Sequence, residues 1–128
     1  EIEARGNHFR MTPLHLASQH GQLDCMRELL DWGADMEAPD YCGFTPLLRT
    51  VLNGQPECLR ELLDRGADKE ARDEEGFTAL LSAAWYGHWE CVRELLEKGA
   101  DKEAWHNGGF TPLLWAASIG QWECVREL

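Results

Sequence analysis

Apolar and polar residues alternate with a helical period over residues 40 to 72. In the segment 56–64, the apolar side chains recur at spacings of three and four, which places them on one face of a helix. Those apolar positions are Cys58, Leu59, Leu62 and Leu63. A first short helix is predicted from Pro46 to Gly54, because a threonine cap and a proline in the first turn favour a helix start. Gly66 closes the second helix, on which Arg60 and Asp64 are spaced to form an ion pair.

This pattern repeats every 33 residues along the whole chain. Three residue types mark the same place in each copy: Thr12, Thr45, Thr78 and Thr111; Gly21, Gly54, Gly87 and Gly120; Cys25, Cys58, Cys91 and Cys124. Each copy contains two short helices and a turn, and neither helix is long enough to be stable alone. The leucines of one copy can be buried only against a neighbouring copy, so the sequence predicts a solenoid of stacked units.

The motifs of these units resemble those of a known family. Residues 11–35 read MTPLHLASQHGQLDCMRELLDWGAD, and later copies open with FTPLL, FTALL and FTPLL. The chain therefore resembles the ankyrin-repeat family. The resemblance implies an all-α solenoid of stacked helix-turn-helix units with projecting β-hairpin turns. It also implies a binding role for the hairpin tips and for the concave face formed by the first helices.

The repeat register divides the chain into units of one ankyrin-repeat domain, 1–128. We expect residues 1–5 to be the end of a preceding unit, followed by units at 6–39, 40–72 and 73–105 and an incomplete unit at 106–128. Terminal units of such arrays normally carry polar caps, and neither end of this sequence looks like one. This favours a segment of a longer chain or a larger complex.

The first unit departs from the others in two places. His15 is the histidine of the T-P-L-H tetrapeptide, whereas later units carry Leu48, Leu81 and Leu114 at that position. The Thr–His hydrogen-bond network of the family is therefore expected in the first unit alone. Arg10 stands where the later turns have glycine, in a turn one residue longer, so a distorted first hairpin is expected.

Composition narrows the class of partner. The 128 residues carry a net charge of −11, which disfavours a phosphate-binding surface and hence nucleic acid. An acidic protein suits a partner with a basic surface. No apolar run reaches the roughly 18 residues of a membrane span, and no signal peptide opens the sequence, so membrane insertion is not expected.

The five cysteines are expected to be free thiols. The four that share a repeat position are interpreted as small core residues, since neighbouring units would hold them too far apart for disulfides. This interpretation favours an intracellular, reducing compartment, with the cytoplasm first, over disulfide or zinc sites.

The sequence contains few residues that could form a catalytic site. His15 and His20 are five residues apart and share a helical face poorly, and His88 and Cys91 occupy positions that glutamine and core cysteine fill in other units. The sequence lacks a glycine-rich phosphate loop and the H-E-x-x-H and G-x-S-x-G motifs. No enzyme activity, catalytic residue, cofactor or metal is predicted.

The positions that vary between units indicate where a partner binds. The two residues before the mid-unit glycine differ in every copy, as does the position four residues after the threonine, which is Leu16, Arg49, Ser82 or Trp115. Large aromatic residues at such positions are typical of binding hot spots. The predicted partner-binding residues are Trp85, Tyr86, Asn53, Arg72, Trp105, Ile119, Glu74 and Glu75. Phe44, Phe77 and Phe110 recur near the turns and fit internal stacking and binding equally well.

Three functions remain open. The first is a non-catalytic protein–protein interaction module that binds a protein or peptide on its concave face. The second is a structural subunit buried in a larger assembly. The third is the targeting part of a larger enzyme or channel whose active domain lies outside this segment.

Overall fold

The computed structural model describes residues 1–6, 9–106 and 108–128. Helices form four consecutive pairs in this part of the chain. Their bounds are α1 Pro13–His20, α2 Leu23–Asp31, α3 Pro46–Leu52, α4 Pro56–Asp64, α5 Ala79–Tyr86, α6 Trp89–Glu97, α7 Pro112–Ile119 and α8 Trp122–Glu127.

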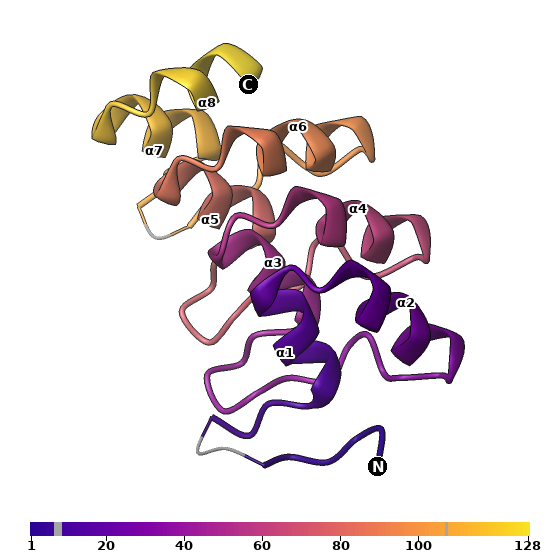
Figure 1. Cartoon of the computed structure of the whole chain (residues 1–128). Helices are drawn as coiled ribbons and strands as arrows, with labels where there is room; N and C mark the ends of the chain where they lie inside the picture. Colours follow the sequence, from indigo (N-terminus) through magenta and orange to yellow (C-terminus); the bar gives the residue numbers. More distant parts are fainter. Residues whose placement is uncertain (7–8, 107) are drawn as a thin grey trace.

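The pairs stack side by side in two rows (Figure 1). The inner helices α1, α3, α5 and α7 contact one another in sequence, and the outer helices α2, α4, α6 and α8 form the second row. The predicted all-α solenoid is confirmed, with turns that project beside the inner helices. We call the surface made by the inner helices and these turns the inner face.

A threonine caps every inner helix, and the first cap has an additional partner. The Thr12 side chain accepts a hydrogen bond from the His15 backbone, and His15 Nδ1 lies 2.8 Å from Thr12 Oγ1. His15 Nε2 lies 2.8 Å from the carbonyl oxygen of Phe44, so this ring joins the first two repeats. Burial lowers the pKa of His15, opposed by the hydrogen bond to Phe44. In the later repeats the threonine caps its helix without a histidine.

The turns before α3, α5 and α7 are closed by one recurring backbone bond. Asp40 N donates to Phe44 O, Asp73 N to Phe77 O and His106 N to Phe110 O, each at 3.0 Å. Within the described residues the only β pairing is a single antiparallel bridge between His106 and Phe110. The hairpin-like turns are therefore loops with little strand character.

The first turn was expected to be distorted because it carries Arg10 in place of glycine. Arg10 adopts the left-handed conformation, with a φ of 57°, which matches the positive φ of Gly43, Gly76 and Gly109. The backbone geometry of this position is thus kept without glycine, a conformation that is uncommon for a residue with a Cβ atom. The tip at residues 7–8 lies outside the described residues.

The core runs continuously between the two rows of helices. Leu62 and Leu95 are fully buried, and Leu63 is nearly so, while Leu96 is half-buried. Cys58, Cys91 and Cys124 are buried as well. These contacts bury the leucine faces of α4 and α6 against their neighbours, as the repeat pattern predicts, whereas Leu29 and Leu30 of α2 are half-buried.

The core assignment of Cys25 was wrong. Cys25 is exposed, although it shares a repeat position with three buried cysteines. It lies on α2, which among the described outer helices packs against α4, so no outer helix covers its other side in this part of the chain. Burial at this position therefore depends on the adjacent repeat and not on the residue type.

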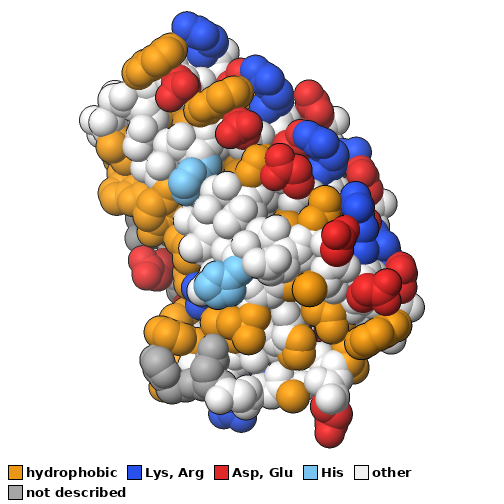
Figure 2. All heavy atoms as spheres, in the orientation of Figure 1, with side chains coloured by type: hydrophobic (Ala, Val, Ile, Leu, Met, Phe, Trp, Pro, Cys, Tyr) orange, Lys and Arg blue, Asp and Glu red, His pale blue; other side chains and the backbone are white. Residues whose placement is uncertain are grey.

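An ion-pair ladder crosses the outer helices (Figure 2). Each rung joins an arginine to a glutamate 34 residues later in the next outer helix: Arg27–Glu61, Arg60–Glu94 and Arg93–Glu127. The predicted Arg60–Asp64 pair is absent from the described residues, because Arg60 reaches Glu94 and Asp64 instead pairs with Lys98 at 2.5 Å. Hydrogen bonds from Arg27 and Arg65 lower the pKa of Glu61, and Arg93 lowers that of Glu127.

A second ladder connects the turns that leave the outer helices. A glutamate carboxylate of one repeat accepts a hydrogen bond from an aspartate N–H of the next, at 2.9–3.0 Å. The rungs are Glu3 to Asp35, Glu37 to Asp68 and Glu70 to Asp101. The ladder accounts for the recurring glutamates, and each of these aspartates uses its own carboxylate to accept the backbone N–H two residues later.

The four mid-repeat glycines all have a positive φ, a conformation that favours glycine. Gly87 ends α5 with a φ of 76°, and a Cβ atom at this position would meet the side chain of Gln121. Gln121 Nε2 donates to Trp85 O over 3.1 Å, which ties the fourth repeat to the end of α5. Trp85 is therefore presented from a backbone that the next repeat holds in place.

Candidate protein-binding surface

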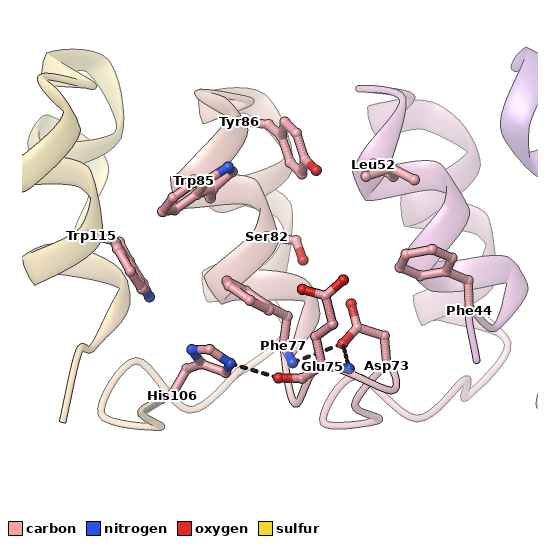
Figure 3. A pocket seen from close by; sticks show the side chains of 10 residues that line it. All are labelled: Phe44, Leu52, Asp73, Glu75, Phe77, Ser82, Trp85, Tyr86, His106 and Trp115. Atoms are coloured by element: carbon pink, nitrogen blue, oxygen red, sulfur yellow. Dashed lines mark hydrogen bonds between the residues drawn. The ribbon is translucent and has the colours of Figure 1, made fainter. Parts of the chain in front are cut away.

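A cavity of about 340 Å³ opens on the inner face between the second and fourth repeats (Figure 3). Aromatic rings and two carboxylates dominate its lining, and we call it the aromatic cavity. Its lining residues are Phe44, Leu52, Asp73, Glu75, Phe77, Ser82, Trp85, Tyr86, His106 and Trp115.

Trp85 and Tyr86 form the upper rim of the cavity, at the last turn of α5. Their exposed fractions are 38% and 50%, which is high for two adjacent aromatic residues. The Trp85 ring meets Trp115 edge to face, with 4.7 Å between ring centroids. Trp85 is thus supported by α7 on one side and also meets Phe77 edge to face at 6.3 Å, and only part of its ring is exposed.

The base of the cavity is a stack of rings from the third and fourth repeats. Phe77 stacks on His106 at 4.1 Å, and Trp115 stacks on Phe110 at 4.5 Å. Figure 3 shows His106 and Trp115 on one side of Phe77, and Phe44 and Leu52 across the open space on the other. Such a stack gives a rigid apolar surface that a partner can cover without reordering it.

The turn before α5 supplies the two carboxylates. Asp73 Oδ1 accepts hydrogen bonds from Glu75 N at 2.8 Å and from Phe77 N at 3.0 Å, so this aspartate shapes the turn. The Glu75 carbonyl lies 2.6 Å from His106 Nε2, which connects the turn to the next repeat. The Glu75 carboxylate points up into the cavity, toward Ser82 (Figure 3).

Two buried polar atoms beside the cavity have no hydrogen-bond partner within the described residues. They are His106 Nδ1 and Trp115 Nε1. Unsatisfied buried polar atoms are rare in folded proteins and call for a physical explanation. A bound partner or solvent that reaches the base of the cavity would satisfy them.

Arg72 and Trp105 border a groove next to the cavity. Arg72 Nη1 donates to Gly76 O at 2.6 Å and to Trp105 O at 3.2 Å, so its guanidinium links successive turns. Trp105 is 60% exposed. The groove also includes Glu75 and His106, which makes it continuous with the aromatic cavity.

The remaining predicted site residues lie apart from the cavity lining. Glu74 faces an adjoining depression with Tyr41 and Cys42. Asn53 follows α3, and its side chain donates to Arg49 O at 3.0 Å. Ile119 is exposed at the last residue of α7. The structure therefore groups Trp85, Tyr86 and Glu75 in one cavity, with the other predicted residues around or beyond it.

The repeat pattern, the stacked helix pairs and the hairpin-like turns agree with the comparison of the chain with known families. A profile described as ankyrin repeats matches in three overlapping copies, over residues 2–73, 32–104 and 51–128. The chain belongs to the ankyrin-repeat family. A search of curated proteins found no significant match.

Ankyrin repeats are generally protein-binding modules, and they account for the whole of the family match. Nothing among the described helices of this ankyrin domain is both long and apolar enough to cross a membrane. No group of three or more potential ligands that could hold a metal ion occurs in the part of the chain that the structure describes.

Sequence reasoning missed much of the cavity of this ankyrin domain. Ser82 and Trp115 share a position that varies between repeats, which was a usable signal. Asp73 and His106 also share a position, but their role depends on the turn geometry. Phe77 stacks on His106 and also lines the cavity, so internal stacking is confirmed for this ring and a binding role stays a prediction.

Proposed function

We propose that this ankyrin-repeat chain is a non-catalytic protein–protein interaction module that binds a protein or peptide on its concave inner face, centred on Trp85 and Tyr86. The observation that carries the proposal is the aromatic cavity, whose rim consists of two exposed aromatic residues at positions that vary between repeats. Tryptophan and tyrosine supply large contact areas and lose little side-chain entropy on binding.

The charge of the chain supports a partner with a basic surface. The net charge is −11, and Glu74 and Glu75 are exposed on the turn beside the cavity. Opposite charges around an apolar centre accelerate association, and salt weakens this effect. The five free thiols are compatible with a reducing compartment, with the cytoplasm as the favoured location.

A titration of displayed peptides tests this function. Random peptides are selected on the wild-type protein, and their affinities are compared between wild type and the double variant Trp85→Ala/Tyr86→Ala. Loss of both rings should weaken binding by at least about 2 kcal/mol. The fold should persist, because this pair of positions is Gln19-His20 and Ser118-Ile119 in other repeats, with a modest fall in Tm from the lost contacts of Trp85 with Phe77 and Trp115.

Trp32→Ala is the matched control. Trp32 is 69% exposed at the end of an outer helix, so its loss removes an exposed indole away from the inner face. Peptides that lose affinity equally with both variants, or with neither, would contradict a binding centre at Trp85 and Tyr86.

A further inference from the structure

The 33-residue register allows the turn of the third repeat to be compared with the same turn in its neighbours. Asp40, Phe44 and Arg49 of the second repeat correspond to Asp73, Phe77 and Ser82 of the third. The aspartate performs the same task in both, accepting two backbone N–H groups of its own turn through Oδ1. The two sites differ in the residue four positions after the threonine.

In the second repeat, Arg49 fills this place. Its guanidinium lies 4.7 Å from the Phe44 ring centroid, and its Nη2 and Nε lie 2.6 and 2.7 Å from Asp40 Oδ2. The Asp40 side chain is fully buried and that of Arg49 is 11% exposed. An aromatic face and a carboxylate together are a favourable site for a planar cation.

In the fourth repeat, Trp115 takes the corresponding position and stacks on Phe110. In the third repeat the residue is Ser82, whose short side chain leaves the place open. Asp73 Oδ2 has no partner within the described residues, and Phe77, stacked on His106 on one side, presents its other side to the cavity. The aromatic cavity thus contains Asp73 and Phe77, the third-repeat equivalents of Asp40 and Phe44. It contains no equivalent of the Arg49 guanidinium.

We propose that the aromatic cavity binds the guanidinium group of an arginine side chain of the partner, in the place that Arg49 occupies in the second repeat. The proposal rests on the proposed function and names the chemistry of the residue that is recognised. Asp73 would accept the guanidinium N–H groups, and Phe77 would stack on its plane. Glu75 adds a second carboxylate, and Trp85 and Tyr86 cover the aliphatic part of the arginine.

Arginine fits this site better than lysine. A guanidinium group is planar, stacks on aromatic rings and donates several hydrogen bonds in fixed directions, whereas an ammonium group is a compact and strongly hydrated charge. The Phe44–Arg49–Asp40 arrangement shows that this fold holds a guanidinium in that geometry.

The test uses three pentapeptide amides, Gly-Gly-X-Gly-Gly with acetylated N-termini, in which X is arginine, lysine or citrulline. Citrulline has nearly the shape of arginine without its charge. NMR titration should show saturable shifts of the Trp85 and Trp115 indole N–H signals with the arginine peptide. The citrulline and lysine peptides should bind at least about tenfold more weakly. Equal binding of the arginine peptide and either other peptide would overturn the proposal.

Asp73→Asn tests the carboxylate directly. Asparagine keeps the oxygen that accepts the turn N–H groups but removes the charge, so the fold should persist while affinity for the arginine peptide falls about tenfold. Glu74→Gln is the matched control, because it removes one charge from the same turn outside the cavity lining. Equal losses in the two variants would assign the effect to net charge and overturn the site.

Ser82→Arg supplies the missing group from the chain itself. The new arginine should pair with Asp73, raise Tm and block the arginine peptide, and the gain in Tm should vanish in the double variant with Asp73→Asn. An unchanged Tm with unchanged peptide binding would overturn the proposal, and Asp73→Asn decides it if Ser82→Arg does not fold.

Two results separate this inference from the proposed function. If displayed peptides depend on Trp85 and Tyr86 while the arginine and citrulline peptides bind equally, the interaction module stands and the arginine site falls. If neither kind of peptide depends on this cavity, both proposals fail.

Discussion

The outer edge and the inner face of this solenoid are built from the same repeat in opposite ways. On the outer edge, equivalent residues make equivalent contacts, so Arg27, Arg60 and Arg93 each pair with a glutamate of the next repeat. On the inner face, equivalent positions hold different residues, and Arg49 and Ser82 produce a filled site in one repeat and an open cavity in the next. The repetition maintains the stack, and the variation creates the aromatic cavity.

The largest effect should come from removing a central leucine. Leu95→Ala leaves a cavity at a fully buried position and should reduce the free energy of unfolding by about 2–5 kcal/mol, measured by urea denaturation. Leu113→Ala is the control, because Leu113 is 45% exposed and its loss should cost less than about 1 kcal/mol. A similar loss in both variants would show that stability is not concentrated between the repeats.

The second-largest effect should be a difference in thiol reactivity between the exposed and the buried cysteines. Cys25 and Cys42 should react with a thiol reagent at least about a hundredfold faster than the three buried cysteines, which require local or global unfolding. Burial raises the pKa of Cys58, that of Cys91 to about 12 and that of Cys124 to about 11, so few of these thiols are ionised near neutral pH. Uniform reactivity of all five in the native protein would contradict the packing described.

A smaller effect should appear as pH falls through the range of histidine. Because the pKa of folded His15 is lowered, the unfolded chain binds a proton first, and stability is lost as pH drops below about 6.5. His15→Leu copies the later repeats and should remove this part of the pH dependence of Tm. An identical pH profile in wild type and variant would show that His15 does not contribute.

The smallest effect should come from one rung of the outer ladder. Glu94→Gln weakens the pair with Arg60 and should lower Tm by a few degrees at low salt, with a smaller loss at high salt. Glu28 occupies the same repeat position but forms no ion pair within the described residues, so Glu28→Gln should have no such salt-dependent effect. Equal responses in the two variants would exclude a contribution from the ladder.

The sequence predicted the framework better than the site. Threonine caps, closing glycines and leucine faces are local signals, and they recur four times, so the helix pairs and their stacking follow from them. Trp85 and Tyr86 were identifiable because they interrupt that recurrence.

Local sequence patterns do not predict the contacts between repeats. Arg60 has a good partner at Asp64 by helical spacing alone, but in the stack it reaches Glu94. Burial of Cys25 depends on a neighbour and not on its own position. The difference between Asp40 and Asp73 also depends on the fold, because Asp40 Oδ2 pairs with Arg49, whereas Asp73 Oδ2 has no partner among the described residues.

The second ladder, in which glutamates connect the turns that leave the outer helices, has a mechanical consequence. Its rungs join residues only 31 or 32 apart in sequence, and each links one repeat to the next. A stretching force applied along the stack would therefore peel repeats off singly and would not break a shared sheet. Each detached repeat of 33 residues releases roughly 110 Å of extended chain, so the molecule would lengthen under load in steps of nearly equal size.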